Sequence, residues 1–312
     1  MKLSSKDLLG LKDLSKEEIV LILDTATTMK GLLKGNAKKM PHLQGKSIIT
    51  LFYENSTRTK TSFELAGKFL GASMSSISAS ASSVQKGENL IDTGKTLDAM
   101  ATDIIIMRHP MSGSAALLSQ YVSAGIVNAG DGMNEHPTQA LLDMYTMREK
   151  YGNLEGLNVS IFGDVLHSRV ARSNLWGLSK LGANVTFCAP YTFLPKDIDK
   201  TKAKITSDKF AAAKGADVLM GLRIQKERQS GGLFPSASEY NAKFGIDTEV
   251  LKLAKKDAIV MHPGPVNRGI EITSEVADSS QSVINEQVTN GLAVRMALLY
   301  LLTRRNINEN ID

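Results

Sequence analysis

Four consecutive polar residues, Ser56-Thr57-Arg58-Thr59, follow an apolar run typical of a β-strand at residues 47–53 and open a helical pattern at residues 57–70. The first turn of a helix offers backbone N–H groups and the positive end of the helix dipole. Hydroxyl groups and a guanidinium add further donors and a positive charge. The combination predicts a site for an oxyanion such as phosphate. The alternative is that Ser56 only caps the helix and Arg58 is a solvated surface charge.

Three further polar clusters follow runs that are typical of strands. They are Arg108-His109-Pro110 after residues 103–107, His136-Pro137-Thr138-Gln139 after residues 125–127, and Arg223-Ile224-Gln225-Lys226-Glu227-Arg228 after residues 218–220. In open α/β sheets, ligands bind beyond the carboxyl ends of the strands. All four clusters are therefore candidates for ligand binding.

Thr59, Arg108 and His136 are the donors that could polarise the carbonyl group of an acyl phosphate. Donors fixed around an oxygen that gains negative charge contribute about 3 kcal/mol each to catalysis. A helix N-terminus disfavours an imidazolium, so we expect His136 to be neutral near pH 7 and to donate one hydrogen bond. Gln139, one turn later, could accept a hydrogen bond from an amide NH2 group. For His136, a capping or packing role is the alternative.

The sequence contains no Gly-x-Ser-x-Gly, His-Glu-x-x-His, Gly-x-x-x-x-Gly-Lys-Ser/Thr or Gly-x-Gly-x-x-Gly motif. We therefore expect direct attack on the acyl group, with catalysis by positioning and electrostatics and with no cofactor or metal. Arg169 follows a strand pattern at residues 158–162 and, with Arg223 and Gln225, forms a cationic set suited to carboxylates. Lys226 and Arg228 extend this set, or belong to a solvated basic loop.

These clusters need a scaffold, and the chain of 312 residues is long enough for two domains. Strand and helix patterns alternate in both halves, which predicts an α/β fold with two doubly wound domains, each a mostly parallel sheet flanked by helices. Long helices at residues 136–151 and 287–304 are expected to join them. The expected domains are residues 1–135 with 288–312, and residues 136–287.

The remaining expected elements come from apolar periodicity. Helices are expected at residues 16–34, 93–101, 113–123, 168–181, 207–214 and 247–254, and strands at residues 103–107, 125–129, 184–189, 216–222 and 257–261. Residues 73–83 are rich in serine and alanine, so most of them are expected to form a mobile surface loop, with a weak strand at residues 74–77. This loop is either a plain linker or carries Lys86 into a site.

Composition narrows the class of protein. The formal net charge of +5 fits small anionic substrates, while short basic runs and 5% aromatic residues argue against nucleic-acid binding. The single cysteine, Cys188, excludes an internal disulfide and a cysteine cluster, and its strand-like context predicts a buried thiol. The N-terminus lacks a signal-peptide pattern, and the most apolar helical segment is short and contains Arg295. We expect a cytoplasmic protein without a membrane span.

Five motifs in the same order resemble those of the transcarbamoylase family, and most closely its aspartate carbamoyltransferase catalytic chains. They are residues 56–64, residues 108–110, residues 136–139, residues 223–228 and His262-Pro263-Gly264-Pro265. The resemblance covers nearly the whole chain. It implies transfer of the carbamoyl group from carbamoyl phosphate to the amino group of L-aspartate, which gives N-carbamoyl-L-aspartate and phosphate in pyrimidine biosynthesis.

The resemblance also implies a role for each matching residue. The phosphate group would be bound by Ser56, Thr57, Arg58, Thr59 and Arg108, and the carbonyl polarised by Thr59, Arg108 and His136. Gln139 and the backbone at Pro263 and Gly264 would hold the carbamoyl NH2 group. L-Aspartate would be bound by Lys86, Arg169, Arg223 and Gln225. Ser82 and Lys86 match a loop that family trimers insert into the neighbouring subunit's site, which implies a homotrimer with shared sites and is compatible with separate regulatory subunits.

Two positions depart from the family pattern, and two other functions remain as alternatives. Gly264 stands where a larger apolar residue is common, and Gln85 where some members have a second lysine. An ornithine carbamoyltransferase would bind a cationic side chain, which a wall of Arg223, Lys226 and Arg228 would repel; its typical His-Cys-Leu-Pro motif is replaced here by residues 262–265. The other alternative is a non-enzymatic sensor of phosphate or carboxylate.

Overall fold

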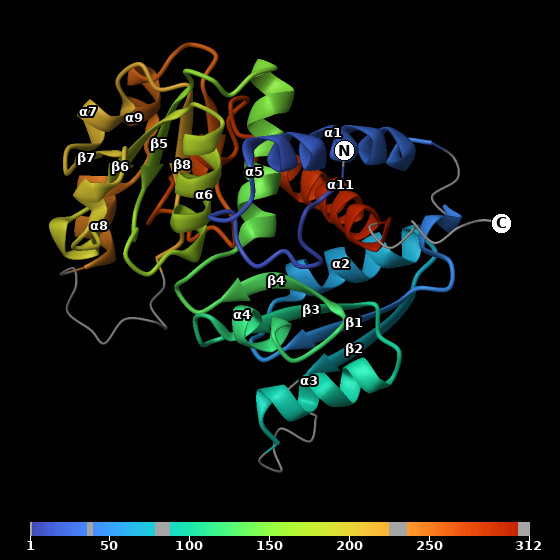
Figure 1. Ribbon diagram of the computed structural model, residues 1–312. Helices are drawn as coiled ribbons and strands as arrows, with labels where there is room; N and C mark the ends of the chain where they lie inside the picture. Colours follow the sequence, from blue (N-terminus) through green and yellow to red (C-terminus); the bar gives the residue numbers. More distant parts are fainter. Residues whose placement is uncertain (1, 36–39, 79–87, 225–235, 305–312) are drawn as a thin grey trace. The chain divides into compact units, whose positions relative to one another are not determined.

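The computed structural model describes residues 2–35, 40–78, 88–224 and 236–304 (Figure 1). The chain divides into two compact units, one formed by Met1–Leu142 with Thr289–Asp312 and the other by Asp143–Val288. Each unit contains one parallel sheet flanked by helices. The predicted α/β class with two doubly wound units is confirmed.

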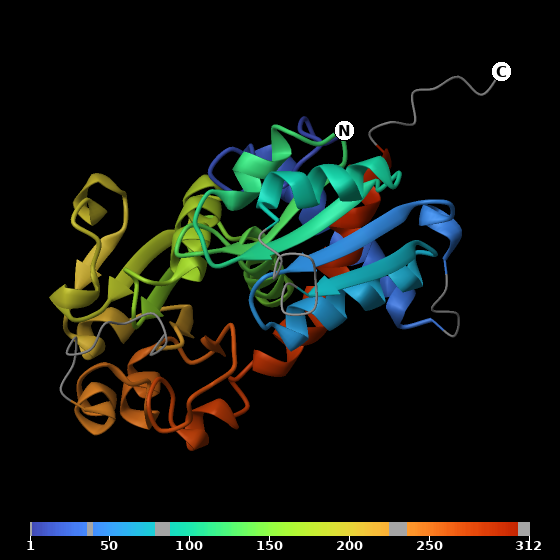
Figure 2. The same ribbon diagram turned by 90° about the horizontal axis from the view of Figure 1, so that it is seen from below.

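The first unit is built on a four-stranded sheet in the order β2-β1-β3-β4, in which all neighbouring strands are parallel (Figure 2). Its strands are β1 (Ser47–Phe52), β2 (Ser73–Ser78), β3 (Ile104–His109) and β4 (Gly125–Asp131). Its helices are α1 (Lys16–Leu33), η1 (Pro41–Leu43), α2 (Thr57–Phe69), α3 (Leu90–Ala99) and α4 (Ser114–Ser119). In Figure 1, α2 lies along one face of the sheet and α3 and α4 along the other.

Side chains of the central strands alternate between the two faces of this sheet. Leu51 of β1 and Ile105 of β3 pack with Leu97 of α3 and Leu118 of α4 in one buried cluster. Because successive side chains of a strand point to opposite faces, Ile48 and its even-numbered neighbours face α2. A parallel sheet that is covered on both faces needs continuous apolar strands, which explains the apolar runs of the sequence.

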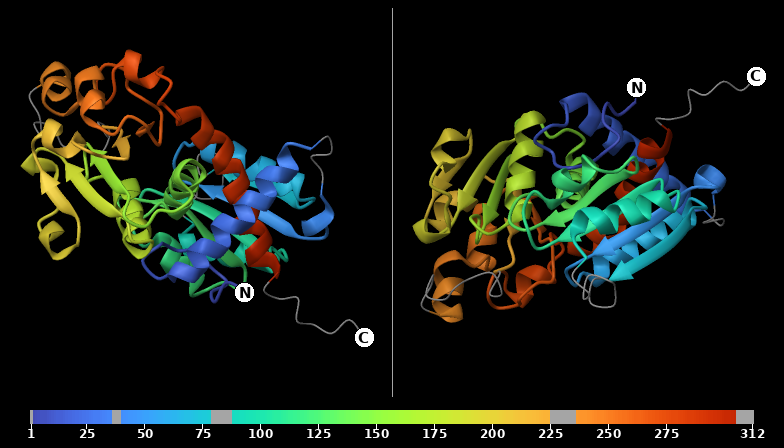
Figure 3. Two further views of the ribbon diagram at one scale, coloured as in Figure 1. Left: turned by 90° about the horizontal axis from the view of Figure 1, so that it is seen from above. Right: turned by 60° about the horizontal axis from the view of Figure 1, so that its bottom comes forward.

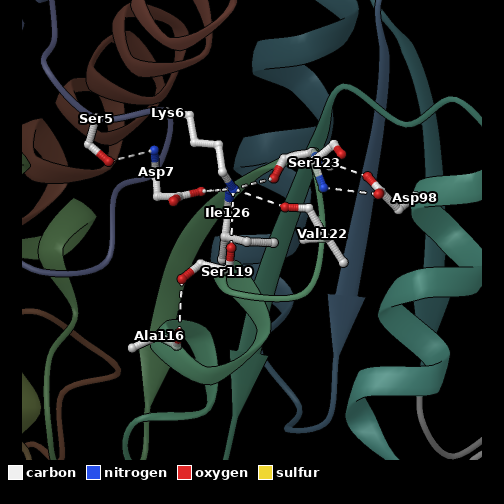
Figure 4. Close-up of polar contacts among 10 residues, drawn as sticks. Ser5, Lys6, Asp7, Asp98, Ala116, Ser119, Val122, Ser123 and Ile126 are labelled. Atoms are coloured by element: carbon white, nitrogen blue, oxygen red, sulfur yellow. Dashed lines mark hydrogen bonds and ion pairs between the residues drawn. The ribbon is translucent and has the colours of Figure 1, made fainter.

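The segment before α1 is held in the first unit by a polar cluster around Lys6 (Figure 4). Lys6 Nζ lies 3.0 Å from the Asp7 carboxylate. It also donates to carbonyl oxygens of Ser119, Val122 and Ala124 at 3.4, 3.2 and 3.1 Å. Lys6 therefore pairs with carbonyl groups at the end of α4 and in the turn that leads into β4.

The second unit is built on a five-stranded parallel sheet in the order β7-β6-β5-β8-β9. Its strands are β5 (Asn158–Phe162), β6 (Asn184–Cys188), β7 (Lys204–Thr206), β8 (Val218–Gly221) and β9 (Ile259–Met261). Its helices are α6 (Arg169–Lys180), η4 (Tyr191–Phe193), η5 (Ile198–Lys200), α7 (Lys209–Ala213), α8 (Ala237–Phe244), α9 (Thr248–Leu253) and α10 (Ser274–Ala277).

One buried cluster of the second unit lies between its sheet and helices α7, α9 and α10. Phe162, Leu219 and Val260 of the central strands pack there with Val250 of α9, all buried. Cys188 belongs to the same cluster and is fully buried, as expected. Burial raises the pKa of its thiol to about 12, so this cysteine is an apolar core residue rather than a nucleophile.

Two long helices join the units, as predicted. Helix α5 (Pro137–Tyr151) begins in the first unit and ends in the second, and α11 (Ile284–Thr303) runs from the second unit into the first. In the first unit, Asn290 of α11 accepts a hydrogen bond from Lys30 Nζ of α1 at 2.7 Å, and Arg295 Nη1 donates to Ser62 Oγ of α2 at 3.0 Å. Figure 3 shows α11 beside α1 in its left view.

The weak strand predicted at residues 74–77 is confirmed as the edge strand β2, which is one residue longer at each end, and the loop predicted for the rest of residues 73–83 lies outside the described residues. The strand forms because its backbone pairs with β1 and because Met74 meets Gly67 of α2, while Ile77 packs on the opposite face. Helices α8 and α10 and strand β7 were not predicted. Within the described residues, no helix has the length and apolar character of a membrane span.

Candidate active site

The order of the strands gives each sheet a topological switch point. In the first sheet it lies between β1 and β3, and in the second between β5 and β8. Ligands of open parallel sheets bind beyond the carboxyl ends of the strands at such points. The predicted site residues lie at or after the carboxyl ends of these four strands: Ser56 comes after β1, Arg108 is the penultimate residue of β3, Arg169 follows β5, and Arg223 follows β8.

The N-terminus of α2 differs from those of most other helices in its capping. Ser56 occupies the N-cap position, but its side chain makes no capping hydrogen bond, whereas Ser15, Ser168 and Ser236 cap α1, α6 and α8. The first turn of α2 contains no acidic residue, so no carboxylate offsets the positive end of the helix dipole there. Ser56 therefore stands at the N-cap without using its side chain to cap the helix.

The exposure of the α2 residues suits contact with a ligand. Thr57 and Arg58 are exposed, Ser56 is partly buried, and Thr59 is 7% exposed. The helix itself is well formed, because Lys60 N donates to Ser56 O at 3.0 Å. The exposed guanidinium of Arg58 and the backbone dipoles of the first turn thus occur together at the N-terminus of α2.

Arg108 is held by two contacts in the first unit. Its Nε lies 3.1 Å from Glu54 Oε2, and its Nη1 donates to Ala129 O at 3.3 Å. The side chains of Arg108 and Glu54 are 14% and 20% exposed, so the ion pair is only partly solvated. The sequence analysis did not identify Glu54, although its position two residues before Ser56 was a signal that it lies near the end of β1.

His109, next to Arg108, packs within the first unit. Its ring centroid lies 4.6 Å from that of Tyr53, and its Nδ1 accepts a hydrogen bond from Met111 N at 3.0 Å. Burial lowers the pKa of His109, which favours the neutral ring. His109 therefore supports the turn after β3.

His136 and Gln139 lie at the start of α5 in the first unit and are 5% and 8% exposed. The turn that leads to them is fixed, because Glu135 N donates to Asp131 Oδ1 at 3.1 Å and Glu135 Oε2 accepts from Leu11 N at 2.7 Å. Gln139 N donates to His136 O at 3.0 Å, so both residues belong to the same helical turn. Their placement beyond β4 agrees with the predicted one.

Arg169 is the first residue of α6 in the second unit and is 4% exposed. Ser168 caps the helix by accepting from Ala171 N at 3.1 Å. The loop before it is fixed by the fully buried Asp164, whose Oδ1 accepts from His167 N at 3.1 Å and lies 2.9 Å from His167 Nδ1. Arg169 therefore leaves a rigid loop at the carboxyl end of β5.

The segment after β8 is tied to the segment after β9 by the buried carboxylate of Glu271, which is 2% exposed. Its Oε1 accepts from Ile224 N, next to Arg223, at 2.9 Å. The same carboxylate accepts from Asn267 N at 2.8 Å and Asn267 Nδ2 at 2.6 Å. Burial raises the pKa of Glu271 despite these donors. Sequence reasoning missed this residue, which lies outside the five motifs.

Residues 262–265 form a tight turn after β9. His262 is 1% exposed, and its Nδ1 accepts from Gly264 N at 2.8 Å. Gly264 has a φ of +64° and is followed by a cis peptide bond to Pro265. A positive φ favours glycine over a residue with a side chain, so Gly264 suits this turn.

Several predicted residues lie outside the part of the chain that the structure describes. These are Ser82, Gln85 and Lys86 of the serine-rich segment, and Gln225, Lys226 and Arg228 after β8. Of the other predicted residues, Ser56, Thr57, Arg58, Thr59, Arg108, His136 and Gln139 belong to the first unit, and Arg169, Arg223, Pro263 and Gly264 to the second. Across residues 2–35, 40–78, 88–224 and 236–304, no cluster of His, Cys, Asp and Glu side chains forms a candidate metal site.

Two protein-domain families match the chain. The carbamoyl-P binding domain of aspartate/ornithine carbamoyltransferase matches residues 6–149, and the Asp/Orn binding domain matches residues 155–302. The chain is 65% identical to the aspartate carbamoyltransferase catalytic subunit of Ruminiclostridium cellulolyticum and 64% identical to that of Acetivibrio thermocellus. Both alignments cover 100% of this chain and 100% of the relative.

Solved structures with the same fold include enzymes of two specificities. Aspartate transcarbamoylase from Trypanosoma cruzi, in complex with carbamoyl aspartate and phosphate, superposes with a TM-score of 0.87 at 31% identity over 96% of each chain. Ornithine carbamoyltransferase from Pyrococcus furiosus superposes with a TM-score of 0.86 at 31% identity, over 96% of this chain and 98% of that one. The likeness of folds alone therefore does not separate aspartate from ornithine as the second substrate.

Proposed function

This chain belongs to the aspartate/ornithine carbamoyltransferase family, and from that premise we infer that it is an aspartate carbamoyltransferase. It transfers the carbamoyl group from carbamoyl phosphate to the amino group of L-aspartate and releases phosphate. The observation that carries this conclusion is full-length identity of 65% and 64% to two aspartate carbamoyltransferase catalytic subunits.

The phosphate group of carbamoyl phosphate binds at the N-terminus of α2 in this proposal. Ser56, Thr57 and Thr59 supply hydroxyl and backbone donors, and Arg58 supplies a charge-assisted pair. The hydroxyl of Ser56, which makes no capping bond, and the absence of acidic residues in the first turn support this assignment. An anion at this place gains from the helix dipole without displacing an internal capping bond.

The carbonyl oxygen is polarised by Thr59, Arg108 and His136. The amino nitrogen of L-aspartate, in its neutral form, attacks the carbonyl carbon, so an N–C bond forms and the carbonyl oxygen becomes negatively charged. Collapse of this intermediate breaks the C–O bond to phosphate, and the attacking nitrogen passes its extra proton to the departing phosphate. Donors fixed in advance stabilise the charge on the oxygen, and the partly buried pair of Arg108 and Glu54 supports such fixed placement.

L-Aspartate is bound by carboxylate-binding residues that follow β5 and β8. Arg169 and Arg223 supply guanidinium groups, and Gln225 and Lys86 supply further donors. The rigid loop before Arg169 and the bond from Ile224 N to Glu271 support a preformed arrangement on this side. Gln139 and the backbone at Pro263 and Gly264 hold the carbamoyl NH2 group, which distinguishes this substrate from other acyl phosphates.

We further propose that the chain forms a homotrimer with shared active sites, in which Ser82 and Lys86 of one subunit reach the site of its neighbour. Both a bare trimer and an assembly with separate regulatory subunits are compatible with this. The product, N-carbamoyl-L-aspartate, places the enzyme in pyrimidine biosynthesis, and we expect it to act in the cytoplasm. The resemblance of the sequence motifs to those of the family supports these assignments.

The test is phosphate release from carbamoyl phosphate by the purified protein, with L-aspartate and L-ornithine offered in parallel and the carbamoylated product identified. We expect turnover with L-aspartate alone. Arg58→Ala should abolish most of it, while Arg172→Ala, an exposed arginine of α6, serves as the matched control. Turnover with ornithine alone would contradict the substrate assignment, and silence with both would favour the sensor.

A further inference from the structure

The second unit contains a chain of buried polar contacts that ends at the turn after β9. Asp143 of α5 is fully buried, and its Oδ1 accepts from Gln287 Nε2 of α11 at 2.8 Å. The other amide atom, Gln287 Oε1, accepts from His262 N at 3.0 Å. Gln287 is 3% exposed, so a single buried amide connects a carboxylate to the first peptide of the turn.

The carboxyl group of Asp143 determines which way the side-chain amide of Gln287 points. Both carboxyl oxygens of Asp143 accept hydrogen bonds, so Gln287 presents its NH2 group to Asp143 and its oxygen to His262 N. The opposite orientation would place two oxygens together and two N–H donors together. Asp143 Oδ2 accepts from Asn174 Nδ2 of α6 at 2.9 Å, and this NH2 group also donates to Val170 O at 3.1 Å. A reversed Asn174 amide would lose both bonds.

His262 is held from its side chain as well as from its backbone. Its Nδ1 accepts from Gly264 N at 2.8 Å, and its Nε2 lies 3.9 Å from Glu271 Oε2. Gln287 contributes the contact to the amide of His262, one residue before Pro263. The Pro263 carbonyl shares a peptide plane with Gly264 N, so the bond from Gly264 N to His262 Nδ1 limits its direction, while Gln287 holds the backbone of the residue that carries this ring.

We infer that Gln287, oriented by Asp143, is a positioning residue that aims the Pro263 carbonyl at the NH2 group of carbamoyl phosphate. Neither side chain touches the substrate; both act through the backbone of the turn. The inference rests on the proposed function, because the contact between the Pro263 backbone and the carbamoyl NH2 group is part of that proposal. Through this carbonyl, Gln287 and Asp143 favour the binding of a carbamoyl group over that of an acyl group that lacks an NH2 donor.

Acetyl phosphate separates this role from a merely structural one, because it has a methyl group where carbamoyl phosphate has NH2. The variant is Gln287→Met, which keeps the length of the side chain but removes both amide contacts. The matched control is Gln281→Met, because Gln281 Nε2 donates to Ala258 O at 2.9 Å in the same unit. Dissociation constants are measured for carbamoyl phosphate, acetyl phosphate and inorganic phosphate, after thermal unfolding confirms a folded protein.

We expect Gln287→Met to weaken carbamoyl phosphate binding about tenfold, the effect of one lost hydrogen bond, with the other two ligands within about twofold of wild type. Gln281→Met should leave all three constants unchanged. Equal weakening of carbamoyl phosphate and acetyl phosphate would overturn the inference, and so would an unchanged ratio between them.

A second variant keeps the test decisive if Gln287→Met does not fold. Asp143→Asn keeps the volume but no longer dictates which way the Gln287 amide points. We expect the same selective loss with a smaller size, about twofold in the ratio of carbamoyl phosphate to acetyl phosphate binding, because equal population of the two amide orientations leaves half of the protein productive. Loss of aspartate turnover by the wild-type protein would refute the proposed function itself. A wild type that turns over aspartate but binds both acyl phosphates equally would refute the Pro263 contact and the inference together.

Discussion

Glu54→Gln tests whether the ion pair with Glu54 prepares Arg108 for catalysis. Arg108 Nε lies 3.1 Å from Glu54 Oε2, and the two side chains are 14% and 20% exposed. A hydrogen bond between charged groups contributes about 1.5–3 kcal/mol, and partial exposure favours the lower end of this range. Glutamine keeps an oxygen acceptor and loses the charge, so we expect a loss of about 1 kcal/mol.

A loss of this size predicts that kcat falls about fivefold, since 1.36 kcal/mol corresponds to a factor of ten in rate. Inorganic phosphate should bind equally well or more tightly, because the substitution removes a negative charge close to a bound anion. The assay therefore measures kcat with L-aspartate and, separately, the dissociation constant of phosphate. Glu17→Gln, at an exposed position in the first turn of α1, removes the same charge elsewhere and serves as the control.

The decisive comparison repeats Glu54→Gln in an Arg108→Ala background. If Glu54 acts only through Arg108, the second substitution has no further effect on kcat, and the coupling energy equals the effect of Glu54→Gln alone. Additive effects of the two substitutions would refute this reasoning. An unchanged kcat in the single variant, or a weaker phosphate affinity, would also refute it.

Four other experiments test the site and the scaffold. His136→Ala should leave a folded protein whose kcat/KM is about 100-fold lower, the usual cost of one oxyanion donor, and an unchanged value would remove His136 from the site. Glu271→Gln should flatten the dependence of stability on pH. Burial raises the folded-state pKa of this carboxyl above 4.5, so between 4.5 and that pKa the folded state holds more protons and the free energy of unfolding falls as pH rises; equal slopes in wild type and variant would contradict the effect. Lys6→Met should lower the free energy of unfolding by about 1–2 kcal/mol, because it leaves three carbonyl groups without their ammonium partner at a half-exposed position, and urea denaturation that shows no change would argue against this cluster. Mixing Arg58→Ala and Lys86→Ala proteins under subunit exchange should restore part of the activity, since one site per hybrid interface then has both residues; the absence of rescue would indicate sites built within one chain.

The sequence predicted those features that depend on neighbours along the chain. Most helices and strands were expected within a few residues of their observed limits, because apolar periodicity reflects burial on a sheet or helix face. Strand β7, with three residues, and α10, with four, are too short to show a period. Strand β2 was only weakly indicated, because its serine residues depend on pairing with β1 rather than on their own burial.

In the candidate site, too, the sequence indicated residues that have a local signal and not those defined by contacts far apart in the chain. Ser56, Arg108 and Arg223 could be found from the sequence, because each follows an apolar strand. Their supports could not be found in this way, because Arg108 is 54 residues from Glu54 and Ile224 is 47 residues from Glu271. Contacts at such separations are set by the order of the strands in the sheet, which no local pattern records. Gln287 and Asp143, 144 residues apart, are the extreme case.

The return of α11 to the first unit also fixes the order in which the chain can fold. The second unit is one continuous segment, Asp143–Val288, whereas the first unit needs Thr289–Asp312 in addition to Met1–Leu142. During synthesis, residues such as Lys30 have to wait for Asn290, their partner 260 residues later. The half of the protein that is made first is therefore completed last, and until α11 arrives the apolar faces of α1 and α2 that it covers remain open to other contacts.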